Sequence, residues 1–380
     1  MILKALKYKS GWLGDWSIVS GTTDDDFVDF SNINLIVGRN ASGKTKFIGA
    51  LRWISDLFDE GARVGVLRNK GNSFEVIFQN NKTLKYYVEF DNADLVVKEI
   101  LSLDNEIKLD REKGKLFYEK LRQSLEFEID DHLLVSSRRD NIQQPFFEIL
   151  HNWGGNLSHY PFGESMGKGK SEKIDDFDSL DIIHFKNKPL VRTFYHRGMN
   201  EFPTQFEQII LNDMNRIDYS LSNIKLDIQS SWLQLSVKER DLNTPTNFRD
   251  MSQGMARAFS LIVQLNYSLM AKIPSCILID DIGEGLDYDR SKKLIELIIE
   301  KAEGSNIQVF MTTNDRFVMN SVPLKYWSVI HREGNKSVFY NYQNSKQTFD
   351  DFAFTGLNNF DFFATEFYRQ GFEEFIATAQ

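Results

Sequence analysis

The chain contains 380 residues, of which 42% are hydrophobic, enough for a large core shared between two or three lobes. Its formal net charge of −9 argues against a protein coated with contacts to nucleic-acid phosphates, although it is compatible with a local basic groove. The one cysteine, Cys276, excludes a disulfide within the chain, and we find neither an apolar run of membrane-spanning length nor a signal-peptide profile, so we expect a cytoplasmic protein that is not embedded in a membrane.

The first third of the chain predicts strands around one helix. Residues 1–7 and the apolar run 33–37 are expected to be strands, and residues 46–54 have the spacing of a helix. Short alternating runs separated by Asn, Asp, Gly and Lys then predict an antiparallel meander. These runs are residues 73–78, 84–90 and 95–97.

The rest of the chain predicts helices first and an α/β pattern later. Helix-like periodicity marks residues 115–128 and 200–218, with a loop-rich stretch at 150–198 between them. Strands are expected at 224–228 and 232–237, and a long helix from near Ser252. The last block alternates strand, helix and strand, which indicates a return to an α/β sheet, at residues 276–280, 290–301 and 307–312.

The most informative motif follows the predicted strand 33–37. It reads Gly38-Arg39-Asn40-Ala41-Ser42-Gly43-Lys44-Thr45, a complete phosphate-binding loop in its strand–loop–helix context. The glycines allow successive backbone N–H groups to face one point, at which the next helix aims its positive end. Lys44 is expected to reach the β- and γ-phosphates and the Thr45 hydroxyl to bind Mg²⁺. The sequence therefore predicts that the protein binds ATP with Mg²⁺.

Two carboxylates follow the later apolar run 276–280. Asp280 is expected to hold the water shell of Mg²⁺, and Asp281 to polarise the attacking water. Because side chains alternate along a strand, the sequence predicts that these neighbours face opposite ways.

A third element lies just before that strand. Ser252 is suited to cap the predicted helix, and Gly254 makes its start another phosphate-facing terminus. In isolation this fragment is an ordinary helix cap. The order of the parts argues otherwise: a phosphate loop, the Ser-x-Gly helix start, the strand with Asp-Asp, then Gly285-Leu286-Asp287 and Thr312-Thr313-Asn314.

This ordered set of motifs resembles the ABC-type ATPases of the AAA group that includes RecF, the SMC-like proteins and the OLD family. The resemblance implies an α/β P-loop NTPase fold of ABC type, with a mixed sheet, an antiparallel β-meander and a helical, loop-rich lobe. We accordingly expect four parts, namely an N-terminal ATPase lobe (1–144), an inserted lobe (145–245), a C-terminal ATPase lobe (246–345) and an aromatic tail (346–380).

The same resemblance implies roles for individual residues. Ser252 and Gly254 would complete the γ-phosphate site of a second subunit, so an ATP-dependent dimer or larger homo-oligomer is implied. Asp287 matches the D-loop, and Asn314 lies at the position of the switch residue. Gln144, or its neighbour Gln143, is our prediction for the glutamine that contacts the metal.

Three departures from the family pattern indicate slow hydrolysis, with ATP binding acting as a conformational clamp. The catalytic Glu is replaced by the shorter Asp281, with Glu284 as the alternative base. The switch His is replaced by Asn314, which forms hydrogen bonds but does not titrate. The signature reads Met-Ser-Gln-Gly-Met instead of a double-glycine form.

Several functions remain open from the sequence. The first is an ATPase that acts as sensor or scaffold for a separate effector, a nuclease or toxin, in bacterial antiphage defence, as in PARIS- and Septu-like systems. The segment after Asp315 is short for a nuclease domain and contains no Asp-x-Asp, in contrast to OLD proteins. The second is a RecF- or SMC-like repair ATPase that clamps DNA. A transporter subunit and a nucleotide kinase fit less well.

Further features bear on partners and nucleotide contacts. Basic residues cluster at Arg138-Arg139, 168–173 and 186–197, and could form a DNA site, although solvated loops are the simpler interpretation. The aromatic tail is expected to pack on the core or to dock a partner. Trp12 and Trp16 are candidates for stacking on adenine.

Overall fold

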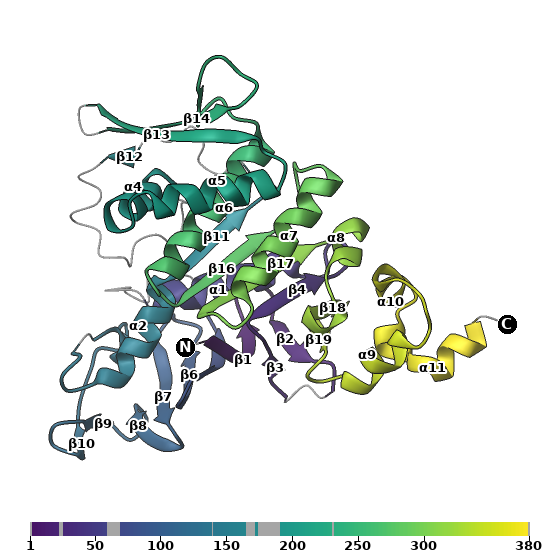
Figure 1. Ribbon diagram of the computed structural model, residues 1–380. Helices are drawn as coiled ribbons and strands as arrows, with labels where there is room; N and C mark the ends of the chain where they lie inside the picture. The colour runs from purple at the N-terminus through teal and green to yellow at the C-terminus, as the bar shows by residue number, and fades with distance from the viewer. Residues whose placement is uncertain are drawn as a thin grey trace. The chain divides into compact units, whose positions relative to one another are not determined.

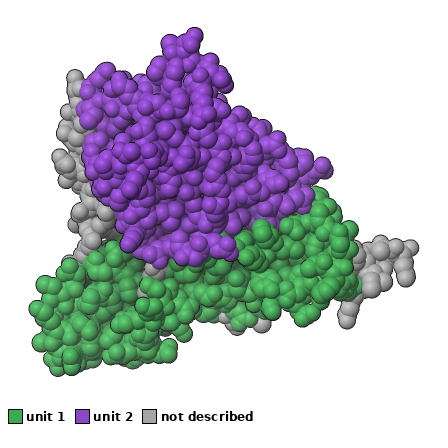
Figure 2. Space-filling view, viewed as in Figure 1, with its two compact units in different colours: residues 1–155, 323–380 green, residues 156–322 purple. Residues whose placement is uncertain are grey.

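The computed structural model describes residues 2–22, 26–58, 69–138, 140–164, 172–173, 191–229 and 232–378. The chain divides into two compact units, shown in Figure 2: unit 1 comprises residues 1–155 and 323–380, and unit 2 comprises residues 156–322. Parts of the basic segments considered above lie outside the described residues, namely Arg139, residues 168–171 and residues 186–190.

Unit 1 is built on a mixed sheet (Figure 1). Its strands run in the order β10-β9-β8-β7-β6-β5-β1-β2-β19-β18-β4, and β3 also pairs with β1. The bounds are β1 (Ile2–Ser10), β2 (Trp16–Ser20), β3 (Val28–Asp29), β4 (Ile33–Val37), β5 (Ser73–Gln79), β6 (Thr83–Phe90), β7 (Val96–Leu103), β8 (Glu106–Asp110), β9 (Lys115–Tyr118), β10 (Gln123–Glu126), β18 (Trp327–Glu333) and β19 (Lys336–Asn341).

The antiparallel meander of unit 1 confirms the strands predicted at 73–78, 84–90 and 95–97. These strands pair in sequence order through β5, β6 and β7. The helix predicted at residues 115–128 is wrong. This stretch forms the antiparallel strands β9 and β10, and β9 also pairs with β8. The short apolar spacing there does not distinguish a helix from a hairpin, and pairing with a neighbouring strand decides the outcome.

Helix α1 packs against the sheet of unit 1 through an aromatic cluster. Trp53 lies edge-on to Tyr8 and Phe74, and Phe58, just after the helix, lies edge-on to Tyr86 and Phe74. The buried residues of α1 recur at helical spacing, which confirms the helix predicted at 46–54. The helices of unit 1 are α1 (Lys44–Leu57), α2 (Glu148–Gly155), α9 (Lys346–Ala353), α10 (Asn359–Ala364) and α11 (Phe367–Thr378), with short 3₁₀ turns η2 (Val135–Ser137), η3 (Pro145–Phe147) and η5 (Leu324–Tyr326).

The aromatic tail folds onto unit 1. Phe362 is fully buried and contacts Trp327 of β18 as well as Phe349 and Phe352 of the tail itself. In contrast, Phe354 is 85% exposed. The tail therefore supplies core residues and also exposes large apolar side chains, of which Phe354 is the most exposed among those that the structure describes.

Unit 2 contains a parallel three-strand arrangement in the order β11-β16-β17 and a second, smaller antiparallel sheet (Figure 1). None of the helices in the described part of the chain combines the length and apolar composition that crossing a bilayer requires. The elements of unit 2 are β11 (Leu157–Pro161), β12 (Glu172–Lys173), α4 (Val191–Glu201), α5 (Gln205–Arg216), β13 (Leu221–Gln229), β14 (Trp232–Glu239), β15 (Thr246–Asn247), α6 (Gln253–Met270), β16 (Ser275–Asp280), α7 (Tyr288–Ala302), β17 (Ile307–Thr313) and α8 (Arg316–Ser321).

A buried carboxylate attaches the segment after the meander to the sheet of unit 1. Glu99 on β7 is fully buried and accepts hydrogen bonds from the backbone N–H groups of Val135 (2.8 Å) and Ser136 (2.9 Å). Tyr86 donates to the same carboxylate (2.8 Å), and Arg111 lies 3.6 Å from it. Burial raises the pKa of Tyr86 well above its usual value, so its hydroxyl remains a donor.

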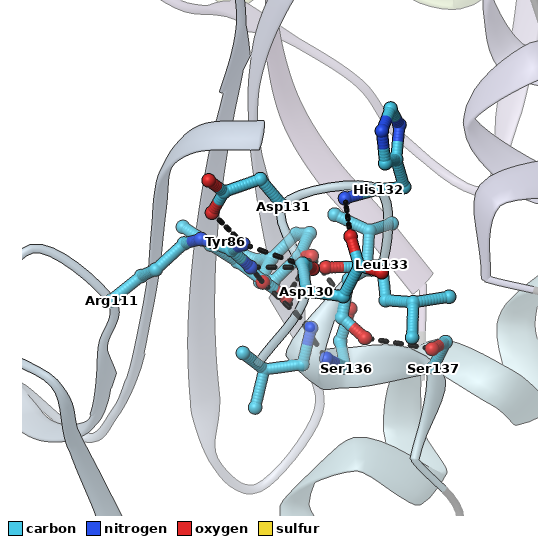
Figure 3. A network of polar contacts seen from close by, with 11 residues as sticks. Tyr86, Arg111, Asp130, Asp131, His132, Leu133, Ser136 and Ser137 are labelled. Carbon is cyan, nitrogen blue, oxygen red and sulfur yellow. Dashed lines mark hydrogen bonds and ion pairs between the residues drawn. The ribbon is translucent and has the colours of Figure 1, made fainter. Parts of the chain in front are cut away.

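The same contact network extends along the loop that carries these N–H groups. Arg111 also donates to the carbonyl of Leu133 (3.0 Å) and pairs with Asp131 (2.9 Å), as Figure 3 shows. Because a buried charge is stable only when paired and hydrogen-bonded, Glu99 holds residues 130–137 in one conformation. The chain continues from there to Gln144.

We predict that Glu99→Ala lowers the free energy of unfolding by about 3–5 kcal/mol, because it leaves Arg111 and two backbone N–H groups without their buried acceptor. Chemical denaturation measures the loss, and hydrogen exchange at Val135 and Ser136 should become faster. Glu126→Ala on β10 is the control, since the Glu126 side chain is 85% exposed and its pair with Lys115 is solvated. Equal stability of the two variants would contradict the role given to Glu99.

Candidate functional site

The glycine-rich loop of unit 1 links the fully buried strand β4 to helix α1, as the sequence predicts. Gly43 precedes the helix with φ +111°, and Ala41 also has a left-handed backbone (φ +62°). These conformations turn the chain sharply, and α1 begins at Lys44 with its N-terminal end at the loop. The arrangement is suited to binding an anion.

Two strands from the other end of the chain enclose this loop. A Cβ added to Gly38 would lie 2.5 Å from Cγ2 of Ile330 on β18, and one added to Gly43 would lie 2.3 Å from Oγ of Ser337 on β19. Ser337 accepts a hydrogen bond from the Trp16 indole (2.8 Å) and donates to the carbonyl of Ser42 (2.9 Å). Both glycines are therefore required by close packing, and Ser337 holds the loop in place.

These contacts also bear on Trp16, one of the two tryptophans considered for adenine. Trp16 is 2% exposed with its indole N–H bonded to Ser337, so it is not free to stack on a base. Trp12 is 47% exposed.

Besides the backbone conformation, two side chains of the loop are consistent with binding of a phosphate. Lys44 is buried, and its ammonium group donates to the carbonyls of Gly38 (2.7 Å) and Arg39 (3.1 Å) at the loop itself. The hydroxyl of Ser42 is buried with no hydrogen-bond partner among the described residues. A buried polar atom without a partner calls for a ligand or water. The loop thus holds a cation, an orphan hydroxyl and a helix N-terminus together.

The tail contacts the same loop from the outside. Arg39 pairs with Glu366 (2.9 Å), and Arg369 lies 3.4 Å from the same glutamate. His331 of β18 contacts the Tyr368 hydroxyl (3.1 Å) and Arg369 (3.2 Å). The chain between α10 and α11 is thereby linked to the second residue of the phosphate loop.

In unit 2, Asp280 ends the buried strand β16. The hydroxyl of Thr312 on the neighbouring strand β17 donates to Asp280 Oδ1 (2.5 Å) and accepts from the backbone N–H of Asp281 (2.9 Å). Asp280 is 9% exposed. Carboxylate and hydroxyl oxygens are the ligands that Mg²⁺ prefers, so the Asp280 carboxylate is of the right chemistry to hold it. Within unit 1, the Thr45 hydroxyl is separately of suitable chemistry.

Asp281 does not continue the strand, which corrects the prediction that it alternates with Asp280 along a strand end. β16 stops at Asp280, and Asp281 has a left-handed backbone with φ +56°. A non-glycine residue pays about 1–3 kcal/mol for such a conformation, which persists where the surroundings enforce it and is common at functional sites. Gly163, after β11, adjoins the Asp281 carboxylate, since a Cβ there would lie 3.6 Å from Oδ2.

The start of helix α6 packs against the turn that follows Asp281. Ser252 is exposed and caps α6 by accepting from the N–H of Met255 (3.2 Å). A serine hydroxyl retains its own O–H donor while it accepts, so the cap leaves Ser252 able to donate to another group. A Cβ on Gly254 would lie 2.3 Å from the carbonyl oxygen of Gly285, so the two backbones are in direct contact.

The remaining predicted residues occupy the following positions. Asp287 caps α7 by accepting from the N–H of Arg290 (3.0 Å), and Glu284 lies exposed in the turn between Asp281 and Asp287. Asn314 is exposed directly after the buried Thr312 and Thr313 of β17. In unit 1, Thr45 is exposed, and Gln144 is buried at the start of η3. The structure thus places Asp280, Asp281 and Thr312 together, and the α6 start beside the D-loop.

Sequence reasoning missed three residues that organise these segments. Ser337 lies in an ordinary strand and offers no signal. Thr312 was included only in a switch motif. Arg257 had a visible signal, because it is the one charged residue between Gln253 and Met270 in a helix that is otherwise apolar and polar-neutral.

The family comparison covers most of the chain. Residues 33–320 match the family described as "AAA domain, putative AbiEii toxin, Type IV TA system". No curated protein matches the chain significantly.

Solved structures of SMC heads are similar in fold. One is an SMC head bound to the C-terminal winged-helix domain of ScpA, with a TM-score of 0.54 and 13% identity over 89% of this chain and 97% of that one. Another is an SMC head with an extended coiled coil, bound to the C-terminal domain of ScpA from Pyrococcus furiosus, with a TM-score of 0.52 and 11% identity over 93% and 99%. The fold is that of an ABC-type P-loop ATPase, as the sequence predicts.

We predict that Gly43→Ala weakens ATP binding at least tenfold, because the added methyl group meets Ser337 at a backbone angle that costs about 1–3 kcal/mol for alanine. Titration with a fluorescent ATP analogue measures it. Gly49→Ala is the matched control: Gly49 lies on the exposed side of α1 with open space around its Cβ position. That change should leave binding intact and stabilise the helix by about 0.5–1 kcal/mol. Parent-like binding by Gly43→Ala would refute the packing argument.

Proposed function

The chain belongs to the AAA family whose model matches it, and from this premise we propose that it is an ATPase whose subunits close on ATP and control a separate effector protein. The observation that carries this proposal is the contact between Gly254 and the Gly285 carbonyl. This contact puts the exposed Ser252 and the D-loop side by side on unit 2. A surface that binds a second subunit in this scheme requires the two to be adjacent.

The residues of unit 1 bind the nucleotide in this proposal. Backbone N–H groups from Gly38 to Thr45 and the α1 terminus receive the phosphates. Lys44 exchanges its two loop carbonyls for phosphate oxygens, and the Ser42 hydroxyl gains a partner. The Thr45 hydroxyl would supply an oxygen ligand to Mg²⁺, which would neutralise part of the charge on the phosphates. Asp280, a residue of unit 2, keeps its proposed role of holding the water shell of the metal. Gln144 is retained as the glutamine that contacts the metal.

The residues of unit 2 act on the γ-phosphate. Ser252 and Gly254 of one subunit face the nucleotide held by the other, where the Ser252 O–H donates to a phosphate oxygen. Asp281 orients the attacking water, and Asp287 accompanies Ser252 at the subunit interface. Asn314 donates its amide to the γ-phosphate without titrating. Such positioning and electrostatic contacts account for most of phosphoryl-transfer catalysis.

Hydrolysis is slow in this scheme, and ATP binding drives the main conformational step. Asp281 is one methylene shorter than glutamate, and its strained backbone is held by the Thr312 contact. Its reach to water is therefore set by the turn and cannot be recovered by side-chain rotation alone. The closed, ATP-bound assembly persists long enough to hold or release an effector.

The effector is a nuclease or toxin in bacterial antiphage defence, on two lines of support. The family's description refers to a putative AbiEii toxin and a type IV toxin–antitoxin system. The SMC heads of similar fold were each solved with a ScpA domain bound, which supports a role for this fold as a partner-binding ATPase. The exposed Phe354 of the tail is a candidate contact for that partner.

A DNA clamp is the second candidate, because the fold neighbours are SMC heads. It requires a basic surface that binds duplex phosphates. The net charge of −9 disfavours it.

We predict that Asp281→Ala traps a closed, ATP-bound assembly, because binding persists while the water loses its orienting group. Light scattering should show a dimer or larger mass with Mg-ATP that outlasts that of the parent protein, and turnover should fall by at least 100-fold. Lys44→Ala is the control and should neither bind ATP nor assemble. Turnover at the parent rate in Asp281→Ala would reject Asp281 as the base and make Glu284 the next residue to test.

Adding short duplex DNA to the same experiment separates the two functions. Assembly on Mg-ATP alone supports a scaffold that awaits a protein effector. Assembly that requires duplex DNA, and that weakens steeply with salt, supports the clamp.

A further inference from the structure

Arg257 is a buried charge inside helix α6. Arg257 is only 5% exposed, and no other residue of α6 is charged. A guanidinium group is always ionised in proteins and is costly to bury unless its N–H groups are satisfied. A buried arginine at this position therefore requires hydrogen-bond acceptors for its guanidinium group, and the structure provides them.

The guanidinium group links three segments of unit 2. Nη1 donates to the carbonyl of Glu284 (2.7 Å), and Nη2 donates to the carbonyl of Glu164 (3.1 Å) and to Gln253 Oε1 (3.1 Å). The group also lies over the ring of Phe162, 5.9 Å from its centroid. All three acceptors are neutral oxygens. The contacts therefore hold these segments in a fixed geometry and do not neutralise the charge of the guanidinium group.

Each of these acceptors lies in a segment that contains or contacts a residue with a proposed role. Gln253 follows Ser252, and Glu284 lies in the turn between Asp281 and Asp287. Glu164 follows Gly163, which adjoins the Asp281 carboxylate. One side chain thus contacts the segments that carry the γ-phosphate donor, the water-orienting carboxylate and the D-loop.

The local glycine explains why the guanidinium can reach this position. A Cβ on Gly285 would lie 2.2 Å from Arg257 Nη1, and Gly285 has φ +77°. Any other residue would displace the guanidinium from the Glu284 carbonyl. Gly285 is therefore required both by its backbone angle and by the arginine beneath it.

We propose that Arg257 is a positioning residue that couples Ser252 to Asp281, so that engagement of the Ser252 end of α6 by the second subunit sets the turn that orients water. This inference rests on the proposed ATPase function. The planar guanidinium connects two backbone carbonyls and the Gln253 side chain at once, and lysine, with a single ammonium group on a flexible chain, does not reproduce that geometry. Loss of the link misplaces the reacting groups, and a displacement of about 1 Å costs about 100-fold in rate.

The test compares Arg257→Lys and Arg257→Ala with the parent protein for ATP affinity, kcat and KM. Because the phosphate loop lies in unit 1, ATP affinity should stay within twofold of the parent value, whereas kcat should fall at least 10-fold in Arg257→Lys and about 100-fold in Arg257→Ala. Millimolar guanidinium chloride should restore part of the kcat of Arg257→Ala, and equal sodium chloride should not. Arg216→Ala is the matched control, since Arg216 pairs with the exposed Glu300 and should retain the parent kcat.

The outcomes separate the coupling from a purely structural role. Parent-like kcat in both Arg257 variants, or a parallel loss of ATP affinity, thermal stability and kcat without guanidinium rescue, overturns the proposal. If Arg257→Ala does not fold, Gln253→Ala replaces it, because this change removes one acceptor at an exposed residue and should lower kcat by a few fold at unchanged ATP affinity. Absence of Lys44-dependent turnover in the parent protein would reject the proposed function itself, whatever the Arg257 variants do.

Discussion

Close backbone packing at the glycine-rich loop is the constraint on which the organisation of unit 1 depends. Gly38 and Gly43 leave no room for a Cβ because β18 and β19 lie against them, and these strands come from the far end of the chain. Ser337 then joins the loop to Trp16 on β2. The shape of the loop therefore depends on both stretches of unit 1, through β2 from the first and through β18 and β19 from the last.

Local physics made much of this fold predictable. The strand–loop–helix order, the meander and the last strand–helix–strand block each depend on short-range patterns of apolar residues and turn formers, and the structure contains all three. The hairpin at β9 and β10 was missed because four-residue strands are too short to show a period of two, and their pairing is decided by β8. The contact of Ser337 with the loop had no local signal, since it joins residues that are far apart in the sequence.

For the site in unit 2, the sequence predicts which residues are present but does not predict their geometry. The sequence predicts Asp280 and Asp281 as a pair, but strand alternation does not describe their geometry, because β16 ends at Asp280 and Asp281 lies in the following turn. The left-handed turn at Asp281 is stabilised by Thr312 from the adjacent strand. A single hydroxyl thereby holds Asp280 through its carboxylate and Asp281 through its backbone, and a shift of β17 relative to β16 would move both carboxylates together.

In the tail, polar and apolar contacts contribute very different amounts to stability. Arg39 is 69% exposed on its side chain, and an exposed ion pair contributes little, so Glu366 does not hold the tail in place. Burial of Phe362 and Phe367 against β18 and the tail helices contributes far more, at about 1.5–3 kcal/mol for each large apolar side chain. The aromatic core thus fixes the tail, whereas the ion pair only links the tail to Arg39 of the phosphate loop. A change in the position of Arg39 costs the tail almost nothing, so the loop can rearrange around a ligand without unfolding the segment that touches it.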